Sequence, residues 1–272
     1  MPILCDYHMH STFSGDAKSP LEDMVKSAIS KGLKQICFTE HMDKCFPYIP
    51  GEEGMFELDT DAYLAELSRV RDIYADKIKV CFGVELGLQA VAVNDNISYA
   101  RKYDFDFVIA SLHVVDGMDP YYPQYYEGKT EEEAYGLYFT RIYENLLAFD
   151  NFDSLGHLDY IVRYGKNRDR DYRYETYKDT IDRILKWLIE NEKSLEVNTA
   201  GLRKGTKDVH PTRDILKRYK ALGGKLITIG SDSHNICDIA ADFDVAECVL
   251  KECGFDYYCM YDNRKPEFVE LV

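Results

Sequence analysis

The chain has 272 residues, a hydrophobic fraction of 46% and a formal net charge of −15 at pH 7. This length fits one large α/β domain, and the composition is apolar enough to form a buried core. The negative charge disfavours non-specific binding to nucleic acid, which requires a basic surface. No apolar run approaches the length of a membrane span, and no basic N-terminal region precedes a long apolar segment. We therefore expect a cytoplasmic protein that binds neither membrane nor nucleic acid.

Short apolar segments alternate with segments of helical periodicity along the chain. The expected strands cover residues 3–7, 35–39, 78–84, 105–112, 154–156, 195–197 and 226–229. The expected helices cover approximately residues 21–32, 59–74, 94–102, 130–149, 174–190, 211–222 and 238–253, with the tail as a candidate strand. Ser19 and Glu22 predict a capping box at the first helix.

Seven strands alternating with helices, without a linker between them, predict a parallel sheet covered by helices. We expect this sheet to close into a barrel within a single domain over residues 1–272. An open, doubly wound sheet is the alternative, and the sequence separates the two poorly.

Polar side chains gather where the predicted strands end. His8 and His10 follow the first strand one residue apart, so their side chains share a face, and Asp16 comes shortly after them. Six of the seven histidines and two carboxylates lie at or just beyond a strand end: His8, His10, His41, His113, His157, His234, Glu85 and Asp232. Since the carboxyl ends of parallel barrel strands share one face, these groups predict a convergent metal site.

With Asp16, this set has six imidazoles and three carboxylates, which suit two or three divalent ions sharing a bridging carboxylate. Such ions ionise a bound water near neutral pH and clamp the oxygens of an in-line displacement at phosphorus. Their positive charge would also allow an acidic chain to bind an anionic substrate.

Two arginines follow predicted strands on the same face. Arg163 comes after the fifth strand and Arg203 after the sixth, and a guanidinium group suits phosphate oxygens. An ordinary surface role is the alternative for each. The remaining histidine, His210, precedes Pro211 at a helix start, where we expect a surface or capping role. A tyrosine-rich loop at 121–126 either covers the organic part of a substrate or packs on the barrel rim.

The residues at the strand ends resemble the PHP (polymerase and histidinol phosphatase) family. The segments that carry the resemblance are Asp6-Tyr7-His8-Met9-His10-Ser11, Thr39-Glu40-His41, Gly83-Val84-Glu85, Ser111-Leu112-His113, Gly156-His157-Leu158-Asp159 and Gly230-Ser231-Asp232-Ser233-His234. Residues 198–203 together with Arg163 look most like the histidinol-phosphatase branch.

The resemblance implies a distorted TIM-like (β/α)7 barrel with a centre of two to three zinc, manganese or iron ions at the C-terminal ends of the strands. It implies three ligand sets: His8, His10, Glu85 and Asp232 for the first ion; Glu85, His113 and His157 for the second; Asp16, His41 and His234 for the third. Many family members have a histidine where Asp16 stands, so a harder metal is expected at the third position.

The resemblance therefore implies a histidinol-phosphate phosphatase of histidine biosynthesis, in which a metal-bridging hydroxide attacks phosphorus in line. Glu85, Asp232, His234 and Asp16 are the catalytic candidates, and Arg163 and Arg203 the phosphate-binding ones. His234, Asp16 or a metal-held water could protonate the leaving group. The alternatives are a phosphoesterase for nucleotides, phosphotyrosine or phosphodiesters, or a non-catalytic metal-binding module. The sequence indicates no oligomeric state.

Overall fold

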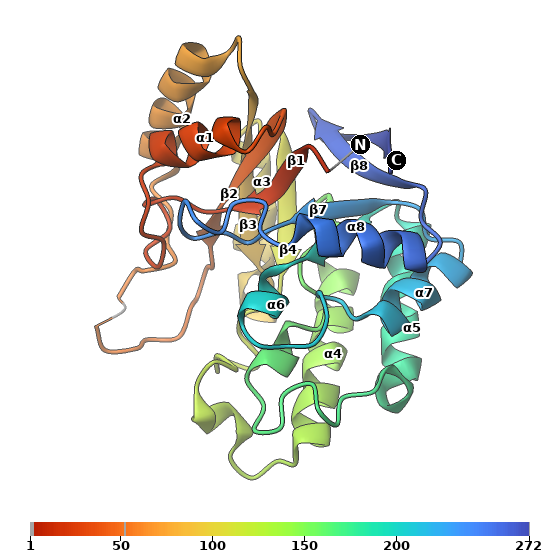
Figure 1. The fold of residues 1–272 in the computed structure, drawn as a ribbon. Helices are drawn as coiled ribbons and strands as arrows, with labels where there is room; N and C mark the ends of the chain where they lie inside the picture. Colours follow the sequence, from red (N-terminus) through yellow and green to blue (C-terminus); the bar gives the residue numbers. More distant parts are fainter. Residues whose placement is uncertain (1–2, 52, 272) are drawn as a thin grey trace.

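A computed structural model describes residues 3–51 and 53–271. Its central feature is a seven-stranded sheet whose strands are all parallel and follow one another in chain order (Figure 1). The strands are β1 (Cys5–Met9), β2 (Gln35–Met42), β3 (Lys79–Gly87), β4 (Phe107–Ser111), β5 (Ser154–Leu155), β6 (Ser194–Asn198) and β7 (Ile227–Gly230).

The first and last strands meet, so the sheet is a nearly closed barrel. The backbone N–H of His10 donates to Ser233 O at 2.8 Å, and the N–H of Asp232 donates to His8 O at 2.7 Å. Met9 and Ser233 form a parallel bridge. These bonds confirm the predicted barrel and exclude the open sheet.

Helices cover the outside of the barrel. They are α1 (Leu21–Ser30), α2 (Thr60–Tyr74), α3 (Val93–Lys102), α4 (Glu131–Ala148), α5 (Tyr174–Glu190), α6 (Ala200–Arg203), α7 (Arg213–Ala221) and α8 (Phe243–Glu252). Short 3-10 turns occur at η1 (Ala90–Ala92), η2 (Pro123–Tyr126) and η3 (Tyr160–Arg163). In the described ranges, no helix combines the length and apolar character needed to cross a bilayer.

Helix periodicity explains the packing, as α1 illustrates. Its buried residues are Leu21, Met24, Val25 and Ala28, which recur at the spacing of one helix face. The predicted capping box is wrong, because Pro20 is the N-cap residue and no side chain caps it. The Ser19 hydroxyl instead accepts a hydrogen bond from the backbone N–H of Ile236 at 3.2 Å.

A C-terminal hairpin closes the opposite end of the barrel from the strand ends that carry the histidines. It consists of the antiparallel strands β8 (Tyr257–Asp262) and β9 (Lys265–Glu270), and β8 lies beside β1 (Figure 1). Tyr261 is buried at this end of the barrel. Its backbone N–H donates to the Tyr7 hydroxyl at 2.7 Å, and its ring lies 4.8 Å from that of Phe107. Its own hydroxyl lies 2.8 Å from Ser194 Oγ.

The hairpin generates a stability prediction. Tyr261→Phe keeps the ring packing but leaves the buried Ser194 hydroxyl without its partner. We therefore expect the free energy of unfolding to fall by roughly 1–2 kcal/mol. Urea unfolding followed by circular dichroism measures this change. The matched control is Tyr257→Phe on the same strand, where the side chain is 46% exposed and little change is expected. Equal free energies of unfolding for both variants would show that the contact between this hydroxyl and Ser194 does not stabilise the barrel.

Candidate metal centre

Glu85, in the last part of β3, is the common neighbour of five imidazoles. Its side chain has no exposed surface. One carboxylate oxygen, Oε2, lies 2.9–3.6 Å from a ring nitrogen of each of three histidines: His8, His10 and His41. The other oxygen, Oε1, lies 3.3 Å from Nε2 of His113 and 3.0 Å from Nε2 of His157.

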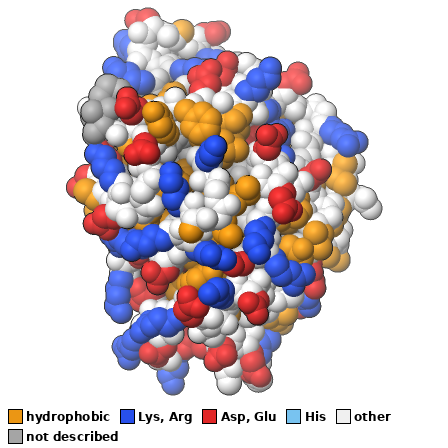
Figure 2. Space-filling view, turned by 90° about the vertical axis from the view of Figure 1, so that its right-hand side faces the viewer, with side chains coloured by type: hydrophobic (Ala, Val, Ile, Leu, Met, Phe, Trp, Pro, Cys, Tyr) orange, Lys and Arg blue, Asp and Glu red, His pale blue; other side chains and the backbone are white. Residues whose placement is uncertain are grey.

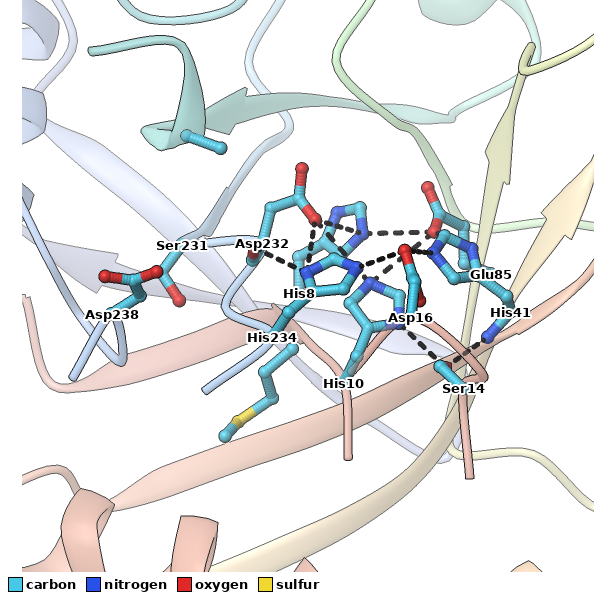
Figure 3. A network of polar contacts seen from close by, with 12 residues as sticks. His8, His10, Ser14, Asp16, His41, Glu85, Ser231, Asp232, His234 and Asp238 are labelled. Atoms are coloured by element: carbon cyan, nitrogen blue, oxygen red, sulfur yellow. Dashed lines mark hydrogen bonds and ion pairs between the residues drawn. The ribbon is translucent and has the colours of Figure 1, made fainter. Parts of the chain in front are cut away.

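Strand geometry brings these side chains together. His8 is the fourth residue of β1 rather than a residue after it, because the strand extends to Met9, two residues beyond the predicted end. His8 and His10 are two positions apart and both point into the barrel, with ring centroids 5.2 Å apart (Figure 3). Their side chains and that of Glu85 are fully buried.

Two further carboxylates lie at the edge of this cluster. Asp232 Oδ1 lies 3.6 Å from ring nitrogens of both His10 and His234. Asp16 Oδ2 lies 3.1 Å from His234 Nε2 and 3.8 Å from His41 Nε2. Asp232 has a left-handed backbone with φ of 53°, which is uncommon for a non-glycine residue and is enriched at functional sites. The structure thus brings all nine sequence-predicted ligand residues into one cluster. Figure 3 labels this set except for His113 and His157.

Several polar atoms at the centre lack a hydrogen-bond partner among the described residues. They are His8 Nε2, His10 Nε2, His41 Nδ1 and Glu85 Oε2, and all are buried. Leaving such atoms unsatisfied costs about 1–3 kcal/mol each. The donors also form four overlapping triplets whose ligand atoms lie within 4.8 Å of one another: His8/Glu85/His157, His8/His10/Asp232, His41/Glu85/His113 and His10/His41/His234. The residues therefore fit divalent metal ions, which would satisfy these atoms.

Two outer carboxylates support the inner imidazoles, and sequence reasoning missed both. Glu196 Oε1 lies 2.6 Å from His8 Nδ1, and Asp43 Oδ1 lies 2.9 Å from His113 Nδ1. A carboxylate on the second ring nitrogen fixes the tautomer of a ligating histidine and increases its basicity. For Glu196 the sequence does contain a signal, because an acidic residue inside the buried strand β6 must have a partner.

The charges within the cluster balance one another. Burial alone raises the pKa of Glu85, but His8 and His113 hold it well below its usual value. Burial lowers the pKa of His41, yet Glu85 and Asp16 raise it to about 9. Burial and the neighbouring His41 ring hold the pKa of His10 well below its usual value. In the ion-free chain, protons on some imidazoles therefore compensate the carboxylates, and an ion entering the cluster would replace them.

A cavity of about 590 Å³ opens above this cluster, and both predicted arginines line it. Arg163 is 6% exposed, and its Nη2 lies 3.3 Å from Asn198 Oδ1 and 3.5 Å from Asp232 Oδ2. Arg203, in α6, donates through Nη2 to the backbone carbonyl of Ser231. Arg163 therefore contacts the cluster through Asp232. Arg203 reaches the residue before Asp232, and its guanidinium nitrogens also lie 3.7 Å from carboxylate oxygens of Asp238 and Asp242.

The structure bears on two further sequence expectations around this cavity. None of the tyrosines at 121, 122, 125 and 126 is among its lining residues; Tyr125 is buried and donates to Ala134 O at 2.7 Å. The aromatic wall consists of Phe46, Phe56, Tyr160 and Tyr164. The surface or capping role expected for His210 is wrong, because this side chain is buried, with its Nδ1 2.6 Å from Asp159 Oδ1.

Comparison with known proteins agrees with this geometry. The chain is 35% identical to the "Probable histidinol-phosphatase" of Clostridium acetobutylicum over 269 residues, which cover 98% of this chain and 97% of that protein. It is 35% identical to the "Histidinol-phosphatase" of Lactococcus lactis over 262 residues, with 96% and 95% coverage.

A solved structure is similar over nearly the whole chain. The crystal structure of histidinol phosphate phosphatase from Lactococcus lactis, complexed with zinc, L-histidinol and phosphate, matches with a TM-score of 0.87 and 33% identity. The match covers 97% of this chain and 98% of that one. The family model for the PHP domain matches residues 6–200. This chain therefore belongs to the PHP domain family.

Proposed function

We propose that this chain is a metal-dependent phosphomonoesterase that hydrolyses L-histidinol phosphate to L-histidinol and phosphate. The observation that carries the proposal is that two arginines and a carboxylate-bridged imidazole cluster line one cavity. The Lactococcus lactis relative, which binds zinc, L-histidinol and phosphate, supports the choice of substrate. The reaction would be a step of histidine biosynthesis.

Two to three zinc, manganese or iron ions would be held by the nine clustered side chains. We assign His8, His10, Glu85 and Asp232 to the first ion, Glu85, His113 and His157 to the second, and Asp16, His41 and His234 to the third. Asp16 and His234 have side chains that are 36% and 27% exposed, whereas Glu85 is fully buried. The third ion would therefore be the one nearest to solvent.

The ions, when bound, would supply a hydroxide nucleophile near neutral pH and would withdraw charge from the phosphate. The chain itself binds and orients the substrate. Arg163 and Arg203 would hold the phosphate oxygens through charge-assisted hydrogen bonds. The aromatic wall of Phe46, Phe56, Tyr160 and Tyr164 offers ring faces against which the imidazole of the substrate can stack.

The leaving alkoxide requires a proton, which Asp16, His234 or a water held by the ions would supply. Asp16 and His234 both line the cavity, with Asp16 Oδ2 3.1 Å from His234 Nε2, so each is placed on the substrate side of the cluster. Glu85 is buried at the centre of the cluster and would be a ligand shared by the first and second ions. Asp232, also beside Arg163, would hold both the ion and the arginine.

The alternative substrates differ in size and charge. A polymeric phosphodiester would need a basic surface along its backbone. Figure 2 shows basic and acidic side chains interspersed over one face of the molecule rather than gathered by sign. The net charge of −15 disfavours a polymeric anion and so favours a small phosphomonoester.

The substrate assignment predicts the order of activities in a phosphate-release assay. We expect L-histidinol phosphate to have a higher kcat/KM than tyrosine phosphate, AMP, p-nitrophenyl phosphate and a bis(p-nitrophenyl) diester. Arg163→Ala and Arg203→Ala should each raise the KM roughly 10- to 100-fold, because each removes a charged hydrogen-bond donor. Arg141→Ala is the matched control, since Arg141 pairs with Asp116 on the surface at 2.7 Å. A faster nucleotide or diester reaction, or arginine variants with an unchanged KM, would contradict the assignment.

The outer carboxylate Glu196 predicts a measurable change in metal content. Glu196→Gln keeps the side-chain shape but removes the charge beside His8, so metal affinity should fall roughly 10- to 100-fold. Elemental analysis after dialysis against graded chelator concentrations measures the loss. Glu190→Gln, at the exposed end of α5, should retain the wild-type content. Wild-type protein with fewer than two metal equivalents, and no activation on adding metal, would leave the metal-dependent reaction without support.

The raised pKa of His41 predicts coupling between metal binding and protons. Because it is about 9 in the ion-free chain, His41 carries a proton at neutral pH and must lose it to ligate an ion. Metal affinity should therefore weaken as the pH falls from about 9 towards roughly 6, with net proton release. Titration calorimetry in buffers of different ionisation enthalpy measures the released protons. A pH-independent affinity without proton release would show that this imidazole is neutral before the ion binds.

A further inference from the structure

A buried pair of side chains lies behind the two arginines and outside the proposed ligand set. Asp159 has no exposed surface and His210 is 1% exposed, and Asp159 Oδ1 lies 2.6 Å from His210 Nδ1. The second carboxylate oxygen, Oδ2, accepts a hydrogen bond from the backbone N–H of Thr212 at 3.0 Å. The pair therefore joins the segment after β5 to the segment that leads into α7.

Asp159 lies at the start of the short turn that carries the first arginine. It is the N-cap residue of η3, and Arg163 is the last residue of that turn. The Asp159 side chain does not cap η3, because its oxygens are used by His210 and Thr212. The position of η3, and thus of Arg163, depends on this connection to the 210–212 segment.

His210 lies against the short helix that carries the second arginine. Its backbone N–H donates to Asn198 O at 2.9 Å, and its carbonyl accepts from Asn198 N at 2.7 Å. Its ring packs directly on Gly201, in the second position of α6. A Cβ atom at Gly201 would lie 2.7 Å from His210 Cδ2 and Nε2 and from Thr206 Oγ1. The imidazole, together with Thr206, thus limits how closely α6, with Arg203, approaches the barrel.

Asn198 connects the two sides. Its Oδ1 accepts from Arg163 Nη2 at 3.3 Å and from the first N–H of α6, that of Ala200, at 3.0 Å. Both arginine-bearing elements have four residues, and helices this short have little stability of their own. Contacts with neighbouring segments must therefore hold them in place.

We propose that Asp159 and His210 form a positioning pair that fixes Arg163 and Arg203 relative to each other on the phosphate-binding side of the cavity. This inference rests on the proposed function, in which both arginines bind the phosphate. Neither residue lines the cavity or belongs to the proposed ligand set. It acts by joining η3 to the segment on which α6 packs, so that both guanidinium groups are oriented before the phosphate arrives.

The test compares two replacements of the imidazole in the metal-loaded enzyme. His210→Ala removes the Asp159 partner, whereas His210→Asn keeps an N–H donor near the position of Nδ1. We expect His210→Ala to raise both the KM for the phosphomonoester and the inhibition constant of inorganic phosphate roughly 5- to 20-fold. His210→Asn should restore both constants to within about 3-fold of wild type. Metal content should be unchanged in both variants.

A third variant moves α6 without removing the pair. Gly201→Ala raises helix propensity but places a methyl group against the His210 ring. It should therefore raise the inhibition constant of phosphate, and the gain in helix propensity should offset part of any loss of thermal stability. Asp208→Asn is the matched control, since Asp208 pairs with Arg213 at 2.6 Å in the same segment but outside this contact. It should leave the KM and the phosphate inhibition constant unchanged.

Separate outcomes identify which idea fails. If Arg163→Ala weakens phosphate inhibition while His210→Ala and Gly201→Ala do not, the positioning role is overturned and the proposed function stands. If the His210 variants lose metal in parallel with phosphate affinity, a general structural role replaces the positioning role. If Arg163→Ala itself leaves phosphate inhibition unchanged, the phosphate assignment of the arginines fails and this inference fails with it.

Discussion

A fully buried carboxylate, Glu85, is the constraint on which the rest of the site depends. An ionised carboxylate without water is very costly unless charges and hydrogen-bond donors surround it. Here five imidazoles surround it at 2.9–3.6 Å. Those imidazoles in turn need partners on their outer nitrogens, which Glu196 and Asp43 supply for two of them. The central carboxylate thus depends on the five imidazoles around it, and two of these imidazoles depend on the outer carboxylates Glu196 and Asp43.

The barrel makes this arrangement possible. Hydrogen bonds between the end of β1 and the segment after β7 bring His8 and His10 next to Asp232 and His234, more than 200 residues away in the chain. The hairpin of β8 and β9 closes the other end, where Tyr261 bonds to Tyr7. The barrel interior therefore lies below the cluster, and the cavity lined by both arginines opens above it. Flexible chemistry-bearing loops would not hold so many buried polar atoms at fixed spacing.

Much of this arrangement could be predicted from the sequence, for a physical reason. Apolar strands ending in histidines predicted the barrel and the cluster, because parallel strands share one polar edge. The outer residues could not be assigned in this way. Whether Glu196 faces the barrel interior depends on register, and Asp43 reaches His113 only through tertiary packing. His210 looked like a helix-start residue because Pro211 follows it, yet two backbone bonds to Asn198 hold it inside the fold. Ser19 likewise bonds to Ile236, far along the chain, in preference to its own helix.

We propose that Glu85 and the imidazoles around it hold several ions together. Diffraction from crystals of the zinc- or manganese-loaded protein, recorded at the absorption edge of that metal, locates the bound ions. We expect at least two anomalous peaks among the imidazoles, with two of them each about 2.0–2.2 Å from an oxygen of Glu85. Peaks only on surface carboxylates, or one ion that does not contact Glu85, would contradict this proposal.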